Sequence, residues 1–369
     1  MTSVADPVRE QYLALLGFSD GDGAAYSTTQ LVRLYENQQI LAGVNATVKK
    51  GEPDVNLNKF PFPSGSGSYG FNLVVTLDGS KVYAVDYQNG KVIPFDVVTS
   101  VFGDPITVGA SPDGIAISPD GKTVYVANGS DNTVSVIDVE TDTVVGTVSV
   151  DPTPYGIAVS PDNSTAWAAC FTTGTVVPID RETLTAGTPI VVDATNGVAG
   201  ITAAPDGKTV WVAGSTLVTA NSAVYPIDVD TLTVGTAIDV ADYLGDLIIT
   251  PDGKTLYVLG VSNGNYVYPI DVETKVVSDP IIGLRLSGGN SNISVMACIS
   301  KLLYVPDGNS YIMVIDIASN ELIANIPDPN VPYGAGSSLD GSVVFVTEGG
   351  SSPGVPSIAR IVRPAFYLP

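Results

Sequence analysis

The stretch Gly114-Ile-Ala-Ile-Ser-Pro-Asp-Gly-Lys-Thr-Val-Tyr-Val-Ala-Asn128 decides the fold, because similar versions of it return along the chain. Close versions begin at Gly156, Gly200 and Leu247, weaker ones surround Asp78 and Asp340, and one that lacks the Asp-Gly turn keeps Leu303-Tyr304-Val305. Counted at the turn, the seven versions stand at positions 78, 120, 162, 206, 252, 299 and 340, with spacings from 41 to 47 residues. A regular period of this length is typical of repeat architectures.

Each repeat predicts four short strands. Runs rich in Val, Ile, Thr and Tyr are separated by Asp-Gly, Asn-Gly or Pro-bearing turns, which is the pattern of β-hairpins. The third run ends in an aspartate that is followed three residues later by a hydroxyl, at Asp96/Thr99, Asp138/Thr141, Asp180/Thr183, Asp228/Thr231, Asp271/Thr274 and Asp316/Ser319. An aspartate in this place can accept backbone N–H bonds and fix the next turn. These acids therefore have an expected structural role.

Seven four-stranded repeats predict an all-β fold, a seven-bladed β-propeller, over residues 69–369. The last repeat has room for only three strands after Val331. A propeller closes when a strand from the other terminus completes the last blade, because closure removes the exposed sheet edges. We expect the segment 55–61 to supply that strand.

The repeat resembles a known family. Thr123-Val-Tyr-Val-Ala-Asn128, Thr133-Val-Ser-Val-Ile-Asp138 and Thr143-Val-Val-Gly-Thr-Val148 are similar to the YVTN β-propeller repeat of bacterial and archaeal surface-layer-type proteins. The resemblance covers residues 69–362 and implies a seven-bladed ring of the kind that lactonase-like enzymes share. Since the motif consists of strand and turn residues, it implies the fold rather than an activity.

Residues 1–68 differ from the repeats and predict a short N-terminal helical arm, a hinge at 61–67 and the closing strand. An N-cap at Asp6 and a first-turn Pro7 begin one helix, and a second amphipathic helix covers 27–41. Its expected role is docking onto other proteins of an assembly, through the apolar positions Tyr12, Leu15, Leu16, Leu31, Leu34 and Tyr35. Tyr12–Ser19 resembles N-terminal segments of tail proteins from phages of actinobacteria, which implies a virion.

Charge and composition exclude several functions. The 16 Lys and Arg against 38 Asp and Glu give a net charge of −22, which opposes binding to nucleic acid and to anionic membranes. The chain has no histidine, so mechanisms that need an imidazole are excluded. No signal-peptide pattern and no membrane-spanning apolar run is present, which favours a virion or else a cytoplasmic or surface-associated location. We interpret Cys170 and Cys298 as small buried side chains.

Propeller ligands usually bind at the mouth of the central channel. Counting seven residues back from each turn gives Phe71, Asp113, Tyr155, Ala199, Gly245, Asn292 and Tyr333, and Asp246 follows directly. Aromatic rings beside amides and carboxylates suit a sugar, so we take Phe71, Asp113, Tyr155, Asp246, Asn292 and Tyr333 as candidate ligand-binding residues for a cell-surface glycan. In the alternative interpretation the two tyrosines only fill the channel or brace turns. We expect no cofactor and no metal site, although Ca²⁺ near Asp113 or Asp246 stays an alternative.

Three functions follow. The favoured hypothesis is a non-catalytic structural or binding propeller in a larger assembly, a minor tail or surface-exposed virion protein that contacts a host surface or other virion proteins. The second is a lactonase-like or glycan-processing enzyme; this is disfavoured because the chain has no histidine and only four arginines in the propeller. The third is a bacterial cell-surface protein of the YVTN type.

Overall fold

The computed structural model describes residues 57–63, 72–193, 197–215, 222–240, 243–260, 266–282, 297–299, 301–308, 311–328, 330–338, 343–349 and 356–361. All of them belong to one compact unit, Asn56–Val362. The predicted helical arm and its docking residues lie outside the described residues, as do Phe71 and Asn292.

The described strands form seven antiparallel sheets, called blades 1 to 7 in chain order. Blade 1 holds β2 (Leu73–Val75), β3 (Lys81–Asp86), β4 (Lys91–Asp96), β5 (Val101–Phe102) and β6 (Ile106–Thr107); blade 2 holds β7 (Pro112–Ile117), β8 (Thr123–Asn128), β9 (Thr133–Asp138) and β10 (Thr143–Ser149). Blade 3 holds β11 (Pro154–Val159), β12 (Thr165–Cys170), β13 (Thr175–Asp180), β14 (Thr185–Ala186) and β15 (Ile190–Val191).

Blade 4 holds β16 (Gly197–Ala203), β17 (Thr209–Ser215), β18 (Ser222–Asp228), β19 (Thr233–Val234) and β20 (Ile238–Val240); blade 5 holds β21 (Leu244–Ile249), β22 (Thr255–Gly260), β23 (Tyr266–Asp271) and β24 (Ile281–Ile282). Blade 6 holds β25 (Ala297–Ile299), β26 (Leu302–Pro306), β27 (Tyr311–Asp316) and β28 (Glu321–Pro327). Blade 7 holds β29 (Pro332–Ser337), β30 (Val344–Glu348), β31 (Ser357–Ile361) and β1 (Leu57–Pro61).

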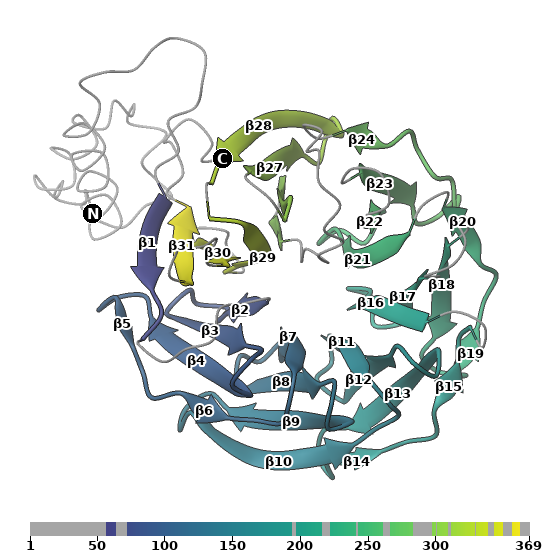
Figure 1. Ribbon diagram of the computed structural model, residues 1–369. Helices are drawn as coiled ribbons and strands as arrows, with labels where there is room; N and C mark the ends of the chain where they lie inside the picture. Colours follow the sequence, from purple (N-terminus) through teal and green to yellow (C-terminus); the bar gives the residue numbers. More distant parts are fainter. Residues whose placement is uncertain are drawn as a thin grey trace, which may run out of the picture. The chain divides into compact units, whose positions relative to one another are not determined.

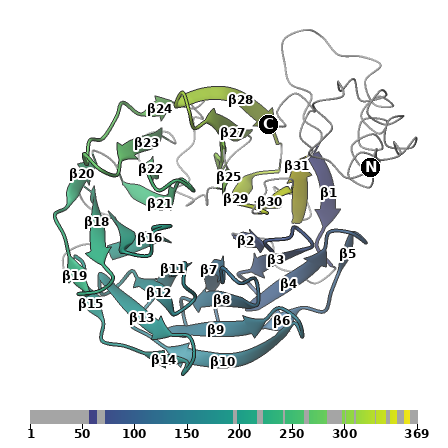
Figure 2. The same ribbon diagram turned by 180° about the vertical axis from the view of Figure 1, so that it is seen from behind.

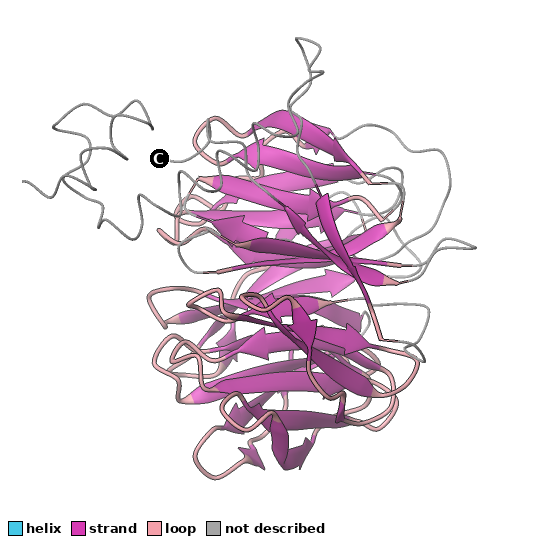
Figure 3. Cartoon of the chain, turned by 90° about the vertical axis from the view of Figure 1, so that its left-hand side faces the viewer, coloured by secondary structure: helices cyan, strands magenta, loops and turns pink. Residues whose placement is uncertain are grey.

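The blades are arranged in a ring, as Figures 1 and 2 show from its two faces. The first strand of each repeat lies innermost, and the fourth lies on the rim. Seen from the side, the described elements are strands joined by loops, without a helix (Figure 3). The predicted all-β, seven-bladed propeller is confirmed.

The repeated acids brace turns, as the sequence predicts. Asp138 accepts hydrogen bonds from the backbone N–H and the hydroxyl of Thr141, at 2.8 and 2.9 Å. The same pair of bonds forms at Asp96, Asp180, Asp228 and Asp271, whereas Asp316 accepts from the backbone N–H groups of Ala318 and Ser319. The acids of the first hairpin act likewise: Asp162, for example, accepts from Ser164.

The rim strands differ from the simple four-strand prediction where the third strand contains a proline. In blades 1, 3 and 4 the fourth strand is split into two short pieces, and the third strand carries Pro94, Pro178 or Pro226 beside the break. Blades 2 and 6 have Val136 and Val314 there and keep continuous rim strands. Proline lacks the N–H that a ladder needs, so it interrupts the pairing.

The hydrophobic core lies between neighbouring blades. Each second strand contributes one aromatic ring that is at most 2% exposed, in the order Tyr83, Tyr125, Trp167, Trp211, Tyr257, Tyr304 and Phe345. The cluster around Tyr83, for example, joins Val92 of blade 1 to Ile115 and Val124 of blade 2. Cys170 is a free, fully buried cysteine in the cluster between blades 2 and 3, and burial raises the pKa of its thiol to about 12. Each blade thus buries its faces against its neighbours.

Strand β1 closes the ring. It lies within the segment expected to do so and pairs antiparallel with β31, from Leu57 opposite Ile361 to Pro61 opposite Ser357. Its Phe60 ring packs on Phe95 of blade 1, with centroids 4.8 Å apart. The closing strand is therefore bound by backbone pairing within blade 7 and by apolar packing against blade 1.

A charged cluster also holds the closing strand. The Lys59 ammonium lies 2.7 Å from a carboxylate oxygen of Asp328, beyond β28, and 2.6 Å from one of Glu348, at the end of β30. Both acids are fully buried, and Glu348 also accepts hydrogen bonds from Ser357 and Asn330. Burial, followed by the contact with Glu348, raises the pKa of Asp328 to about 7. We call Lys59, Asp328 and Glu348 the closure cluster.

Candidate functional site

The innermost strands are bulged at the residues that face the channel. The pairing register shifts between Pro112 and Ile115 in β7, and the strands β11, β16, β21 and β29 shift at the corresponding place. A bulge lets two successive residues stand opposite one and re-aims their side chains. The channel wall is consequently built from two positions of each such repeat, for example Asp113 and Gly114.

The second of these positions is glycine in blades 2, 3 and 4 because the inner strands approach closely there. A Cβ atom added at Gly114 would lie 2.3 Å from the carbonyl oxygen of Tyr155, and one at Gly156 equally close to that of Ala199. At Gly200 it would lie 2.8 Å from the Cα atom of Asp246. The glycines therefore allow adjacent blades to meet at the channel.

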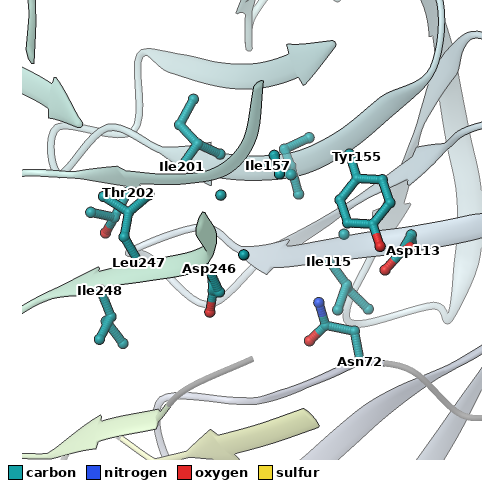
Figure 4. Close-up of a pocket in the computed structure, with 15 residues that line it drawn as sticks. Asn72, Asp113, Ile115, Tyr155, Ile157, Ile201, Thr202, Asp246, Leu247 and Ile248 are labelled. Carbon is teal, nitrogen blue, oxygen red and sulfur yellow. The ribbon is translucent and has the colours of Figure 1, made fainter. Parts of the chain in front are cut away.

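A cavity of about 150 Å³ opens between these strands (Figure 4). Its polar side chains are those of Asn72, Asp113, Tyr155, Thr202 and Asp246, and its apolar wall is formed by Ile115, Ile157, Ile201, Leu247 and Ile248. Blades 1 to 5 all contribute to it. The structure thus brings Asp113, Tyr155 and Asp246, three of the candidate residues, into one site.

Asp113 and Tyr155 form a hydrogen-bonded pair in this cavity. The tyrosine hydroxyl donates to the carboxylate, and Figure 4 shows the two groups facing each other. Asp113 is only half-buried by surface area, yet it lies deep among the inner strands, and desolvation raises its pKa to about 7. Desolvation and the charge of Asp113 raise the pKa of Tyr155. Near neutral pH the carboxyl can therefore either donate or accept a hydrogen bond.

Asn72 belongs to the site, but the sequence analysis did not select it, because counting seven residues back from the turn at position 78 gives Phe71. It is 6% exposed, its side-chain oxygen accepts from the backbone N–H of Leu73 at 2.9 Å, and it lines the cavity. The signal in the sequence is a departure from the repeat: Asn72 and Asp246 stand where blades 2, 3 and 4 have glycine.

The remaining candidates are not part of the cavity as the structure describes it. Tyr333 is 5% exposed, does not line the cavity, and lies so close to Gly349 that a Cβ atom there would meet its ring at 2.3 Å. This placement agrees with the interpretation of Tyr333 as a bracing residue. Phe71 and Asn292 lie outside the described residues.

Within the described ranges, no three acidic or sulfur-bearing side chains gather closely enough to hold a metal ion. The described lining of the cavity offers two carboxyl groups, a phenol, an amide and the hydroxyl of Thr202. In the same part of the chain there is no helix of the length and apolar character that a bilayer crossing requires.

Comparisons with known proteins agree with the fold. A family model described as Arylesterase matches residues 105–244, less than half of the chain. Among solved structures, one similar chain belongs to the hydrazine synthase of Kuenenia stuttgartiensis, with a TM-score of 0.71 and 21% identity over 86% of this chain and 98% of that one. Identity at this level shows a shared fold alone. The search of curated proteins found no match.

Proposed function

We propose that this protein is a non-catalytic binding propeller that takes a sugar unit of a surface glycan in the cavity at its channel mouth. The observation that carries the proposal is the convergence of Asp113, Tyr155 and Asp246 on one cavity with an apolar wall. Carboxyl and phenol groups exchange hydrogen bonds with sugar hydroxyls, while aliphatic and aromatic faces contact the C–H face of the ring. The small volume suits one terminal unit rather than a long chain segment.

Binding to an array of neutral and acidic glycans tests this proposal. The intact protein is expected to bind a defined set of glycans, and Asp113→Asn and Tyr155→Phe are expected to weaken that binding at least tenfold. Asp104→Asn, which removes a carboxylate from an exposed loop, is the matched control and should bind normally. The proposal is refuted if the intact protein binds no glycan, or if both cavity variants bind glycans as tightly as the intact protein does.

A second candidate, ester or lactone hydrolysis, is supported by a specific observation. The Arylesterase match spans Asp113 and Tyr155, and an acid with a pKa of about 7 is suited to general acid–base catalysis. This candidate predicts turnover of aryl esters or lactones that disappears in Asp113→Asn. No turnover above the buffer rate on such a panel would exclude it.

The larger assembly in which the protein works is proposed from the N-terminal arm alone. We propose that residues 1–56 dock the propeller into a larger assembly such as a virion, on the strength of the resemblance at Tyr12–Ser19. Replacing Leu15 and Leu16 by Asp should then abolish incorporation into the assembly while the thermal unfolding of the propeller stays unchanged. Retained incorporation would contradict the docking role.

A further inference from the structure

The cavity carries polar side chains at two positions that blades 2, 3 and 4 fill with glycine. In blades 2, 3 and 4 a Cβ atom at this position would strike the backbone of the next inner strand. In blades 1 and 5 the same position holds Asn72 and Asp246, whose side chains line the cavity (Figure 4). These two side chains depart from the glycine pattern of blades 2, 3 and 4, and both face the same cavity.

Among the described residues, the amide nitrogen of Asn72 is a hydrogen-bond donor without an acceptor. The residue is 94% buried, since its exposed fraction is 6%, and its oxygen already accepts from the N–H of Leu73. No group among the described residues accepts from its amide nitrogen, which borders the cavity. Buried polar groups are normally hydrogen-bonded, so this nitrogen points to a ligand oxygen as its partner.

The other polar groups define the charge of that ligand. The described lining contains the carboxyl groups of Asp113 and Asp246 and no lysine or arginine. A ligand carboxylate placed between them would be repelled, and the described lining offers it no cation to pair with. A hydroxyl suits all three polar residues, because it can accept from Asn72 and donate to a carboxylate.

We infer that the cavity selects neutral sugar rings with adjacent hydroxyls over acidic sugars, and that Asn72 and Asp246 are the residues that determine this selectivity. The inference rests on the proposed glycan-binding function and names the class of glycan. The apolar wall of Ile115, Ile157 and Leu247 contacts the C–H face of the ring, while the amide and the carboxylates bind its edge.

Calorimetric titration of the intact protein with methyl glycosides of neutral hexoses, each paired with the hexuronic acid of the same configuration, tests the inference at pH 7.5. The neutral partner is expected to bind at least tenfold more tightly. Asn72→Asp keeps an oxygen to accept from Leu73 but replaces the amide donor by a carboxyl group, so it should weaken binding of the neutral sugar at least tenfold, and thermal unfolding of the same preparation checks that the variant is folded. Asp246→Asn should reduce severalfold the ratio of the affinity for the neutral sugar to the affinity for the matching uronic acid.

Asn58→Ala, on the exposed outer face of β1, is the matched control and should leave every affinity unchanged. Equal or tighter binding of the uronic acids, or undiminished binding by Asn72→Asp, would overturn the inference. If the glycan array shows only acidic glycans, the selectivity is refuted while the binding function stands. If no glycan and no methyl glycoside binds, both are refuted.

Discussion

Acidic side chains in this propeller occupy two kinds of place, at the tips of turns and inside the ring. The turn aspartates Asp96, Asp138, Asp180, Asp228 and Asp271 are at the surface, and hydrogen bonds from the hydroxyl residue three positions on lower their pKa values. The inner acids Asp113, in the cavity, and Asp328, in the closure cluster, are desolvated, and their pKa values rise to about 7. One residue type therefore exists in two opposite electrostatic environments.

The two groups of acids therefore change the stability of the fold in opposite directions as the pH rises. A carboxyl whose pKa is lowered by folding stabilises the native state above its unfolded pKa, and that stabilisation is lost as pH falls through the lowered value. A carboxyl whose pKa is raised binds more protons folded than unfolded, so it lowers stability as pH rises from about 4 to about 7. The turn aspartates maintain the fold at neutral pH, whereas the inner acids oppose it there.

The largest effect is expected from Lys59→Met. This change leaves Asp328 and Glu348 buried beside each other without their cation, and breaking a buried ion pair costs about 3–5 kcal/mol. Denaturant unfolding at pH 7.5 measures the loss. Arg181→Met, which breaks the part-exposed pair with Asp120 between blades 2 and 3, is the control and should cost at most about 1 kcal/mol. Equal costs for the two variants would contradict the distinction between inner and surface charges.

The pH dependence of unfolding tests the inner acids directly. The melting temperature of the protein is expected to rise when the pH is lowered from 7.5 to 5.5, because Asp113 and Asp328 take up protons in the folded state. In Asp113→Asn this rise should be smaller, since one of the two groups no longer titrates. Asp104→Asn removes the same charge from an exposed loop, and its rise should equal that of the unmodified protein.

Replacing Asp113 is expected to raise the stability of the fold and to weaken glycan binding. Asn cannot ionise, so Asp113→Asn should be more stable than the unmodified protein at pH 8 while its glycan binding is at least tenfold weaker. Thermal unfolding and the glycan array on the same preparation measure both. A variant that is destabilised at pH 8 would show that the carboxylate has a structural partner stronger than Tyr155.

The smallest effect is expected at a turn. Thr141→Val removes the hydroxyl bond to Asp138 and leaves the backbone bond in place, so it should cost about 0.5–1 kcal/mol. The loss should be largest at neutral pH, where Asp138 is ionised, and should shrink as the pH falls through its lowered pKa, which urea titrations at pH 7 and in strong acid can compare. A cost that is the same at both pH values would mean that the carboxylate charge is not involved.

Features that depend on neighbours in the sequence could be predicted here. The turn aspartates, the strand ends and the number of blades follow from residues within one repeat, and they are found as expected. The split rim strands also have a local cause in Pro94, Pro178 and Pro226, although the four-strand prediction did not use it. Local hydrogen bonding and proline chemistry act over a few residues, so the sequence displays them directly.

The candidate site was predictable only in part. Counting from the turns located Asp113, Tyr155 and Asp246, because the repeats keep a nearly constant distance from turn to channel. It missed Asn72, since the count gave one position in each blade and ended at the residue before it, Phe71. The closure cluster could not be predicted from the sequence, because Lys59, Asp328 and Glu348 come from three separate segments that only the closed ring brings together.

The origin of β1 at the opposite end of the repeats has a consequence for how the protein is made. Among the described strands β1 leaves the ribosome first and its partner β31 leaves last, so β1 stays unpaired until all seven repeats have emerged. Contacts this distant along the chain form slowly. A chain that still lacks β31 therefore has an unclosed seventh blade with an unpaired strand edge, the kind of edge at which chains pair with one another.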